Sequence, residues 1–308
     1  MSTVAAPFIG IVTVLYNSDE VLADFFASLA TQEGVRYRLY VIDNGTTDSG
    51  TRLSEALAAQ HGIDAVCVFN NANVGVAKGN NQGIEKALAD GCSHVLLANN
   101  DTAFAPRTIV TLLEAMRETG SPAATPKIMY HGKPDMLWYA GGHTSPWVGY
   151  SVHHGDMAID EGQFDQQGAT DYAPTCFMLI ERRVFEVVGL MDELYFVYFD
   201  DTDFVWRMKA RGMGLLYVPS SVVLHKVSTS TGGSHSPFTM YYVNRNRLYF
   251  VVKNFRGLHR WVALAYYALT RPPRLLLVPR KAGAQGWRGV RDGIRLCAAV
   301  PDAAGGRR

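Results

Sequence analysis

The first 125 residues alternate four times between an apolar, β-rich run and a segment with helical patterning. The runs are FIGIVTVLYN (8–17), YRLYVID (37–43), AVCVFN (65–70) and HVLLAN (94–99). Continuous apolar runs predict strands that are buried on both faces. Because parallel strands need a crossover between them, strand–helix alternation is typical of a mostly parallel, doubly wound (Rossmann-like) sheet. The sequence therefore predicts an α/β fold.

The intervening segments predict helices after Asn17 or Ser18, around 52–59, over 84–89 and from Pro106 to Gly120. The glycine- and asparagine-rich segment 71–83 is expected to be a loop. From Lys127 the alternation breaks down. A strand at TCFMLIE and a short helix at RRVFEVVG follow, then a helix that begins near Asp201, and two strands at 214–219 and 221–226.

Polar residues or glycines follow all four predicted strands, where ligands of parallel sheets bind. Turns favour the same residue types, but four such ends at one rim indicate a site. They are Tyr16 and Asn17, Asp43 and Asn44, Asn71, Asn73 and Gly75, and Asn99, Asn100 and Asp101.

Two of these carboxylates fit nucleotide chemistry. Asp101 is suited to a hard divalent cation, which takes oxygen ligands from carboxylates and phosphates. Asp43 is placed to accept hydrogen bonds from a nucleobase or a ribose. The first strand is followed by VLYNSDE, which lacks the glycines of a dinucleotide site, and no P-loop sequence occurs.

The segment FDDTDF places Asp200, Asp201 and Asp203 at the start of a helix. Acidic residues there also oppose the helix dipole, and Asp203 has ion-pair spacing with Arg207. Adjacent carboxylates beside the aromatic run YFVYF raise each other's pKa, which suits a general base. His225, at the end of SVVLHK, fits either a structural hydrogen bond or a ligand role.

The charge is divided unevenly along the chain. Residues 245–308 contain 14 Lys and Arg against two acids, which leaves 15 basic and 26 acidic residues in 1–244. Such a tail predicts contact with an anionic membrane surface; a solvated helical subdomain is the alternative, and no nucleic-acid module accompanies it. No apolar run reaches the length of a membrane span, no signal peptide is evident, and the four scattered cysteines fit a reducing cytosol.

Taken together, the ordered motifs resemble the family-two glycosyltransferases with the glycosyltransferase-A fold, with the bacterial rhamnosyltransferase-like branch closest. They are VLYNS, VIDNGTTD, NVGVAKGNNQGI, LLANND, TCFMLIERRVFEVVG, MDELYFVYFDDTDFVWRMKARG and VVLHKVS. NND stands where the family commonly has Asp-x-Asp, and Asp200 stands where a Glu is usual.

The resemblance implies a role for each matching residue. Asp201 is the expected catalytic base with Asp200 beside it, and Asp101 and His225 are expected to hold Mg²⁺ or Mn²⁺. The expected donor-binding residues are Tyr16, Asn17, Asp43, Asn44, Gly75, Lys78, Gly79, Asn80, Asn99 and Asn100.

The implied activity is inverting transfer of a sugar, with L-rhamnose from dTDP-rhamnose as first choice, to a hydroxyl of a glycan or polyprenyl-linked acceptor. A nucleotidyltransferase and an inactive nucleotide-sugar-binding partner are the alternatives.

The expected division is a catalytic domain over 1–226, with a donor half to about 125 and an acceptor half from 126. A lid loop and a basic, mostly helical extension follow over 227–308. The expected location is the cytoplasmic face of the inner membrane.

Overall fold

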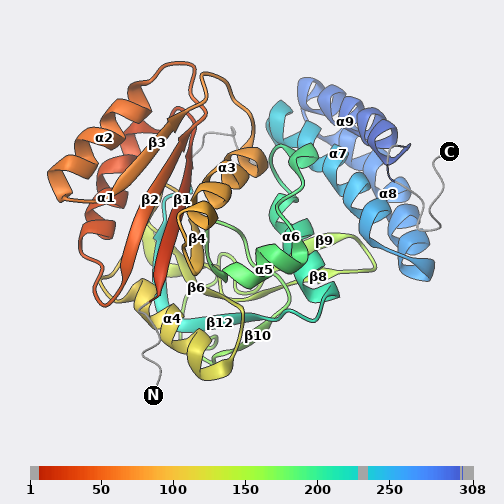
Figure 1. Ribbon diagram of the computed structural model, residues 1–308. Coiled ribbons are helices and arrows are strands. Elements are labelled where there is room, and N and C mark those ends of the chain that lie inside the picture. Colours follow the sequence, from red (N-terminus) through yellow and green to blue (C-terminus); the bar gives the residue numbers. More distant parts are fainter. Residues whose placement is uncertain (1–6, 228–234, 299, 301–308) are drawn as a thin grey trace.

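The computed structural model describes residues 7–227, 235–298 and 300, and Figure 1 shows a large sheet flanked by helices, with a further group of helices beside it. Eight strands form the path β10-β12-β6-β11-β4-β1-β2-β3, and β5 and β7 pair with β12 and β6. The predicted lid is the loop STSTGGSHSP, residues 228–237, and its part from 228 to 234 lies outside the described residues.

The predicted alternation is confirmed in the first half of the chain. Strands β1 (Phe8–Leu15), β2 (Arg36–Asp43), β3 (Ala65–Phe69) and β4 (His94–Ala98) are parallel. Helices α1 (Leu22–Ala30) and α2 (Ser49–His61) lie on one side of β1–β3, and α3 (Val76–Ala89) lies on the other (Figure 1). All four strand ends therefore meet at one edge.

The expected loop over 71–83 is correct for 71–75 and wrong from Val76, where α3 begins and takes in Lys78, Gly79 and Asn80. The reason is close packing of the helix on β1. A Cβ at Gly79 would lie 2.9 Å from Val14 Cγ1, and one at Gly83 would overlap Val12. These glycines let the helix approach the sheet, so tertiary packing overrides their weak helix propensity.

The helix expected from Pro106 begins two residues later, as α4 (Thr108–Thr119), and ends at Gly120 as predicted. Gly120 adopts φ 70°, the left-handed conformation that commonly ends a helix.

The second half of the sheet is mixed. Strand β11 (Phe177–Glu181) lies antiparallel between β4 and β6 (Ala123–Tyr130), and β6 is parallel to β12 (Leu215–His225). Six of the eight strands in the path thus point the same way. The remaining strands are β5 (Thr102–Phe104), β7 (Lys133–Tyr139), β10 (Gly168–Thr170) and the separate hairpin of β8 (Gly142–Ser145) and β9 (Tyr150–His153).

The two strands expected over 214–219 and 221–226 are one strand, β12, with a register shift between Val218 and Val222. Pro219 suggested a break in the sequence, since proline cannot donate to a ladder. In the structure it lies at an irregularity where a missing donor is tolerated.

Short helices lead to the predicted acidic helix. Helix α5 (Arg182–Val188) is followed by the 3₁₀ helix η2 (Glu193–Tyr195), which precedes α6 (Asp200–Ala210). The other 3₁₀ helix, η1 (Asp19–Val21), precedes α1. The predicted start of α6 near Asp201 is confirmed to within one residue.

The helical C-terminal extension is confirmed as α7 (Pro237–Asn254), α8 (Gly257–Leu277) and α9 (Arg280–Ala298), which lie together in Figure 1. Gly289 and Gly293 of α9 face the backbone of α7, where a Cβ at Gly289 would overlap the carbonyl oxygen of Tyr241. Phe250 of α7 also packs in one buried cluster with Tyr195 and Phe199. The extension therefore shares a core with the segment that precedes α6.

No helix among residues 7–227 and 235–298 combines the length and the apolarity that crossing a bilayer requires. All four cysteines have free thiols.

Candidate active site

A cavity of about 360 Å³ opens at the carboxyl ends of β1, β2 and β4 and at the start of α3. The polar strand ends that the sequence singled out therefore do converge. Its lining includes Tyr16, Ser18, Asn44, Asn73, Gly75, Asn80, Thr175, Phe196 and the run Asn99, Asn100 and Asp101. We call it the strand-end cavity.

Four of the expected donor-binding residues do not line this cavity. Asp43 is buried and its carboxylate accepts hydrogen bonds from the amides of Gly45 (2.8 Å) and Thr51 (2.9 Å) and from the Thr51 hydroxyl (2.9 Å). It therefore organises the turn into α2, a role that its strand-end position does not distinguish from ligand binding.

The other three are displaced by local geometry. Asn17 is exposed and has φ 49°, and Lys78 is exposed on the surface of α3. Gly79 faces β1, where it permits helix–sheet contact. The expected loop would have presented Lys78 and Gly79 to the donor, and the helix does not.

Gly75 joins the cavity to the chain before α6. Its φ of 90° favours glycine, and a Cβ there would lie 2.6 Å from the carbonyl oxygen of Phe196. That oxygen accepts a 2.6 Å hydrogen bond from the amide of Val76, at the start of α3. Helix α3 and the segment before α6 are thus directly bonded.

Asp101 and His225 meet at the edge of the strand-end cavity. Both are buried, and His225 Nε2 lies 3.1 Å from Asp101 Oδ1. His225 is there because it ends β12, which pairs with β5 just after Asp101. Within the described ranges no three His, Cys, Asp or Glu side chains converge as a metal site. A cation bound here would take two protein ligands and further oxygens from phosphate, a donor set that suits Mg²⁺ or Mn²⁺.

A second cavity, also of about 360 Å³, surrounds Asp201. We call it the Asp201 cavity, and its lining includes Tyr150, His153, Tyr172, Tyr198, Phe199 and Val243. Asp201 Oδ2 accepts a 2.8 Å hydrogen bond from Tyr172 Oη, and Oδ1 accepts one of 2.6 Å from the amide of Thr202. The carboxylate is therefore fixed in orientation at the cavity wall.

Burial raises the pKa of the Asp201 carboxyl, while the hydrogen bonds from Tyr172 and Thr202 lower it. Burial also raises the pKa of Asp200, and repulsion from Asp201 raises it further. Asp200 does not line the cavity, so Asp201 is the exposed member of the pair. A carboxylate with a raised pKa is a stronger base, which is what removing a proton from a hydroxyl requires.

The two cavities lie side by side. Thr175 and Phe196 line the strand-end cavity, whereas Tyr172 and Phe199, from the same two segments, line the Asp201 cavity. Cys176 follows Thr175 in the chain, and its pKa is raised by burial and then by the charges of Asp101 and Asp201. Both carboxylates are therefore within electrostatic reach of one buried thiol.

A series of ring contacts links His225 to Tyr172. Trp138 lies edge-on to both His225 and His153, with ring centroids 4.5 and 4.6 Å apart, and His153 stacks on Tyr172 at 5.7 Å. Sequence analysis missed Trp138, His153 and Tyr172, because they come from irregular segments with no periodic pattern. The aromatic and histidine content of 136–156 was the available signal.

The backbone just before α6 is strained. Phe196, Tyr198 and Phe199 all have positive φ (66°, 63° and 68°), which is uncommon for residues other than glycine. The amide of Val197 donates a 2.8 Å hydrogen bond to Tyr195 O, which closes a rare type of γ-turn at Phe196. Such strain persists only where neighbouring structure holds it.

Asn246 of α7 supplies much of that support. It is fully buried, and its Nδ2 donates to the carbonyl oxygens of Tyr195 (2.9 Å), Val197 (2.7 Å) and Tyr198 (2.8 Å). Arg245 adds hydrogen bonds to Leu194 O and Tyr195 O. The C-terminal extension thus positions the segment that leads into Asp201.

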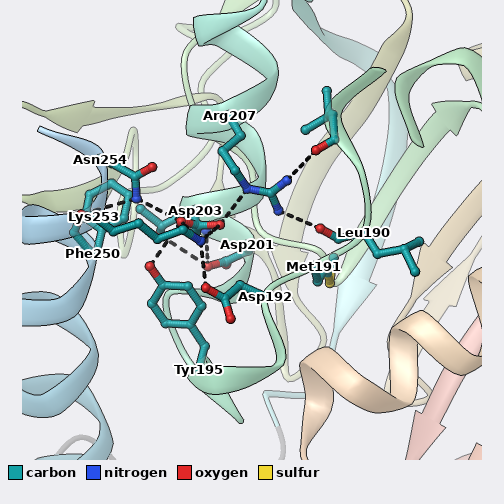
Figure 2. Close-up of polar contacts among 12 residues, drawn as sticks. Leu190, Met191, Asp192, Tyr195, Asp201, Asp203, Arg207, Phe250, Lys253 and Asn254 are labelled. Atoms are coloured by element: carbon teal, nitrogen blue, oxygen red, sulfur yellow. Dashed lines mark hydrogen bonds and ion pairs between the residues drawn. The ribbon is translucent and has the colours of Figure 1, made fainter. Parts of the chain in front are cut away.

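A buried charge network fixes the other side of α6 (Figure 2). Asp203 is fully buried and forms ion pairs with Arg207 (2.7 Å) and Lys253 (2.9 Å). Its carboxylate also accepts hydrogen bonds from Tyr195 Oη (3.1 Å) and Asn254 Nδ2 (2.8 Å). The predicted Asp203–Arg207 pair is confirmed, and it extends to the end of α7.

The sheet, its strand-end cavity and the neighbouring Asp201 cavity define a protein of the glycosyltransferase-A class. Solved structures with the same fold include the mannosyltransferase PcManGT of Pyrobaculum calidifontis in complex with GDP-Man and Mn²⁺ (TM-score 0.58, 14% identity, covering 98% of this chain and 77% of that one). Residues 1–349 of S. aureus TarS are similar too (TM-score 0.59, 13% identity, 96% and 83% covered).

The chain belongs to glycosyl transferase family 2, whose model matches residues 10–189. It is 26% identical over 246 residues to the N-acetylglucosaminyl-diphospho-decaprenol L-rhamnosyltransferase of Mycobacterium tuberculosis, covering 72% of this chain and 77% of the relative. It is 24% identical over 252 residues to the dTDP-rhamnosyl transferase RfbF of Shigella flexneri, covering 79% of each chain. The predicted family and its rhamnosyltransferase-like character are confirmed.

Proposed function

We propose that this glycosyltransferase moves L-rhamnose from dTDP-rhamnose, with inversion, to a hydroxyl of a polyprenyl-diphosphate-linked sugar. The names of the two relatives support the donor and the acceptor class. The observation that carries the proposal is the pair of adjoining cavities, with Asp101 and His225 at the edge of one and Asp201 in the other.

In the proposed mechanism the nucleotide occupies the strand-end cavity, where Asn44, Asn99 and Asn100 offer neutral polar contacts. Asp101 and His225 would hold Mg²⁺ or Mn²⁺, which supplies charge neutralisation on the departing phosphate. Asp201 accepts the proton of the acceptor hydroxyl as its oxygen bonds to the anomeric carbon. The carbon–phosphate-oxygen bond breaks on the opposite face, and the nucleoside diphosphate leaves.

Binding of the donor should depend on Asp101 through the cation. We expect dTDP-rhamnose with Mn²⁺ to raise the melting temperature of the wild type, by the equivalent of about 2.7 kcal/mol at a hundredfold excess over Kd. Asp101→Asn should lose the Mn²⁺-dependent part, because an amide is a poorer cation ligand. Thermal-shift assays with and without Mn²⁺ measure this, with the exposed Asp171 changed to Asn as control. Equal Mn²⁺ dependence in Asp101→Asn and wild type would refute the metal assignment.

The pH profile should report the raised pKa of Asp201. The base must be ionised, so activity is present above its pKa and is lost as the pH falls through it, at a higher pH than for an ordinary Asp. Tyr172→Phe removes a hydrogen bond that lowers this pKa. We therefore expect the acid limb of kcat against pH to move to still higher pH.

The matched control for that profile is Tyr217→Phe, which removes another hydrogen-bonding hydroxyl (3.1 Å to Phe164 O) outside both cavities. An acid limb that stays in place in Tyr172→Phe, or moves equally in both variants, would contradict the role of Asp201.

We also propose a peripheral position on the cytoplasmic face of the inner membrane, with α8 against the lipid. Its exposed apolar residues recur at helical spacing and are 68–85% exposed: Leu258, Trp261, Leu269, Leu276 and Leu277. Helices α8 and α9 together carry eight Lys and Arg and one acid, Asp292. An apolar stripe beside basic residues is the pattern of an interfacial helix.

Replacing Trp261 and Leu269 together by Asp should weaken co-sedimentation with vesicles that contain phosphatidylglycerol, because it removes apolar area and adds repulsive charge. Wild-type binding should also fall with added salt. Val187→Asp, at an exposed apolar position of α5, is the control. Undiminished binding by the double variant would rule out this face of α8.

A further inference from the structure

A third cavity, of about 620 Å³, lies between α7, α8 and the β8–β9 hairpin. Three arginines line it, Arg247 from α7 and Arg271 and Arg274 from α8. We call it the arginine cavity. It shares Tyr150 and Val243 with the Asp201 cavity, so the two adjoin.

Two of the three guanidinium groups are buried without a countercharge. Arg247 and Arg271 are 3% and 7% exposed. Arg247 Nη2 donates to Val148 O (2.6 Å), whereas the buried Nε of Arg271 has no hydrogen-bond partner. In the part of the chain that the structure describes, no Asp or Glu lies within ion-pair distance of Arg247, Arg271 or Arg274.

A buried positive charge without a partner carries a penalty of several kcal/mol. Burial and, after it, the charge of Arg271 lower the pKa of Arg247 to about 10. A guanidinium group with that pKa still carries its charge at neutral pH. Arg247 Cζ lies 5.5 and 5.7 Å from the ring centroids of Tyr266 and Tyr267, and these cation–π contacts offset part of the penalty. An anion in the cavity would offset the rest.

We propose that the arginine cavity binds the diphosphate group of an isoprenoid-diphosphate-linked acceptor. This rests on the proposed function. Guanidinium groups bind phosphate oxygens with paired, charge-assisted hydrogen bonds, and two neighbouring phosphates match three arginines. The shared wall at Tyr150 and Val243 lets the sugar attached to that diphosphate reach Asp201.

The cavity also has an apolar exit for the lipid. Leu277 lines it and is 85% exposed, and it belongs to the exposed stripe of α8 together with Leu276. An isoprenoid chain leaving the diphosphate can follow that stripe. Asp201, the three arginines and the apolar stripe of α8 therefore follow one another in the same order as the sugar, the diphosphate and the isoprenoid chain of a lipid-linked sugar.

The test is calorimetric binding of farnesyl diphosphate to the full-length protein in EDTA, so that no cation supports diphosphate binding at Asp101. We expect saturable binding that weakens by ~10-fold or more in Arg271→Gln and in Arg274→Gln, from the loss of a charged hydrogen bond. Arg271→Lys should recover part of it. Arg280→Gln removes an equal charge from an exposed position of α9 outside the cavity and should bind like wild type.

Two further ligands distinguish the sources of affinity. Inorganic pyrophosphate should bind more weakly than farnesyl diphosphate with the same dependence on the arginines, and farnesol should not show that dependence. The proposal is overturned if the wild type fails to bind farnesyl diphosphate, or if Arg280→Gln weakens binding as much as the cavity variants do. It is also overturned if Arg274→Gln binds like the wild type. Because Arg274 is exposed, its replacement should not disturb folding.

Donor binding is measured separately on the same variants. Arg271→Gln and Arg274→Gln should keep the thermal shift with dTDP-rhamnose and Mn²⁺. If the wild type shows a normal thermal shift with the donor but does not bind farnesyl diphosphate, only the proposed arginine subsite is ruled out. If the wild type shows no thermal shift with the donor, the proposed function is contradicted, and the calorimetric result can still be interpreted.

Discussion

Asp201→Asn should reduce kcat by ~10²–10⁴-fold, the usual contribution of a general base. Asparagine has nearly the same shape and can keep contact with Tyr172, but its amide cannot take a proton from the acceptor. Since Asp201 lines the Asp201 cavity and not the strand-end cavity, the thermal shift with dTDP-rhamnose and Mn²⁺ should be retained. Steady-state transfer assays and thermal shifts on the same preparation measure both.

The matched control is Asp171→Asn, which removes a carboxylate from an exposed position paired with Lys209 (2.6 Å). It lies one residue from Tyr172 but lines neither of the two adjoining cavities. Its kcat should stay within a few-fold of wild type. Transfer by Asp201→Asn at the rate of this control would show that another group serves as base.

Asp203→Asn should lower the free energy of unfolding by about 3–5 kcal/mol, because it leaves buried charge without its partner. The carboxylate at 203 balances both Arg207 and Lys253, and an amide can hydrogen-bond to them without balancing either. Since this network joins α6 to the end of α7, we expect the loss to appear in global unfolding. Urea denaturation followed by far-UV circular dichroism measures it.

Glu186→Gln provides the comparison, since it breaks an exposed i,i+4 pair with Arg182 (2.9 Å). Surface pairs of this kind contribute about 0–1 kcal/mol. Equal midpoints for the Asp203 and Glu186 variants would mean that the buried network adds no more than a surface pair.

The strand ends show how far the sequence alone reaches. Apolar runs ending in Asn and Asp predicted both the parallel strands and their shared edge, because side-chain burial and turn chemistry are local. Asp101 and Asn44 line the cavity as expected. Asp43 has the same local pattern, yet it bonds to Thr51 of α2, and only the path of the chain after the strand decides that.

Glycine was the least informative residue type. Gly79 and Gly83 suggested a loop, whereas they permit α3 to lie close against Val12 and Val14. The distinction depends on what lies opposite each residue in space, which no single sequence states. Tyr172 was missed for a related reason, since its contact with Asp201 joins segments 29 residues apart without any periodic pattern.

The C-terminal extension was predicted from charge as a membrane-facing tail. Its charge pattern gave no sign of Asn246, an uncharged side chain that contacts residues about 50 positions earlier. Long-range hydrogen bonds by a single amide leave no trace in composition. The membrane contact and the division of the chain at residue 226 stay predictions.

The segment from Phe196 to Phe199 connects the strand-end cavity to the Asp201 cavity. One end is bonded to α3 beside the strand-end cavity, its middle is bonded to Asn246 of α7, and the next residues are Asp200 and Asp201. When a ligand enters either cavity, we expect α3 or α7 to move as a rigid body, because the hydrogen-bonded segment between these helices cannot lengthen. A crystal structure with dTDP-rhamnose alone should therefore show that residues 196–199 are displaced on the side of the Asp201 cavity as well.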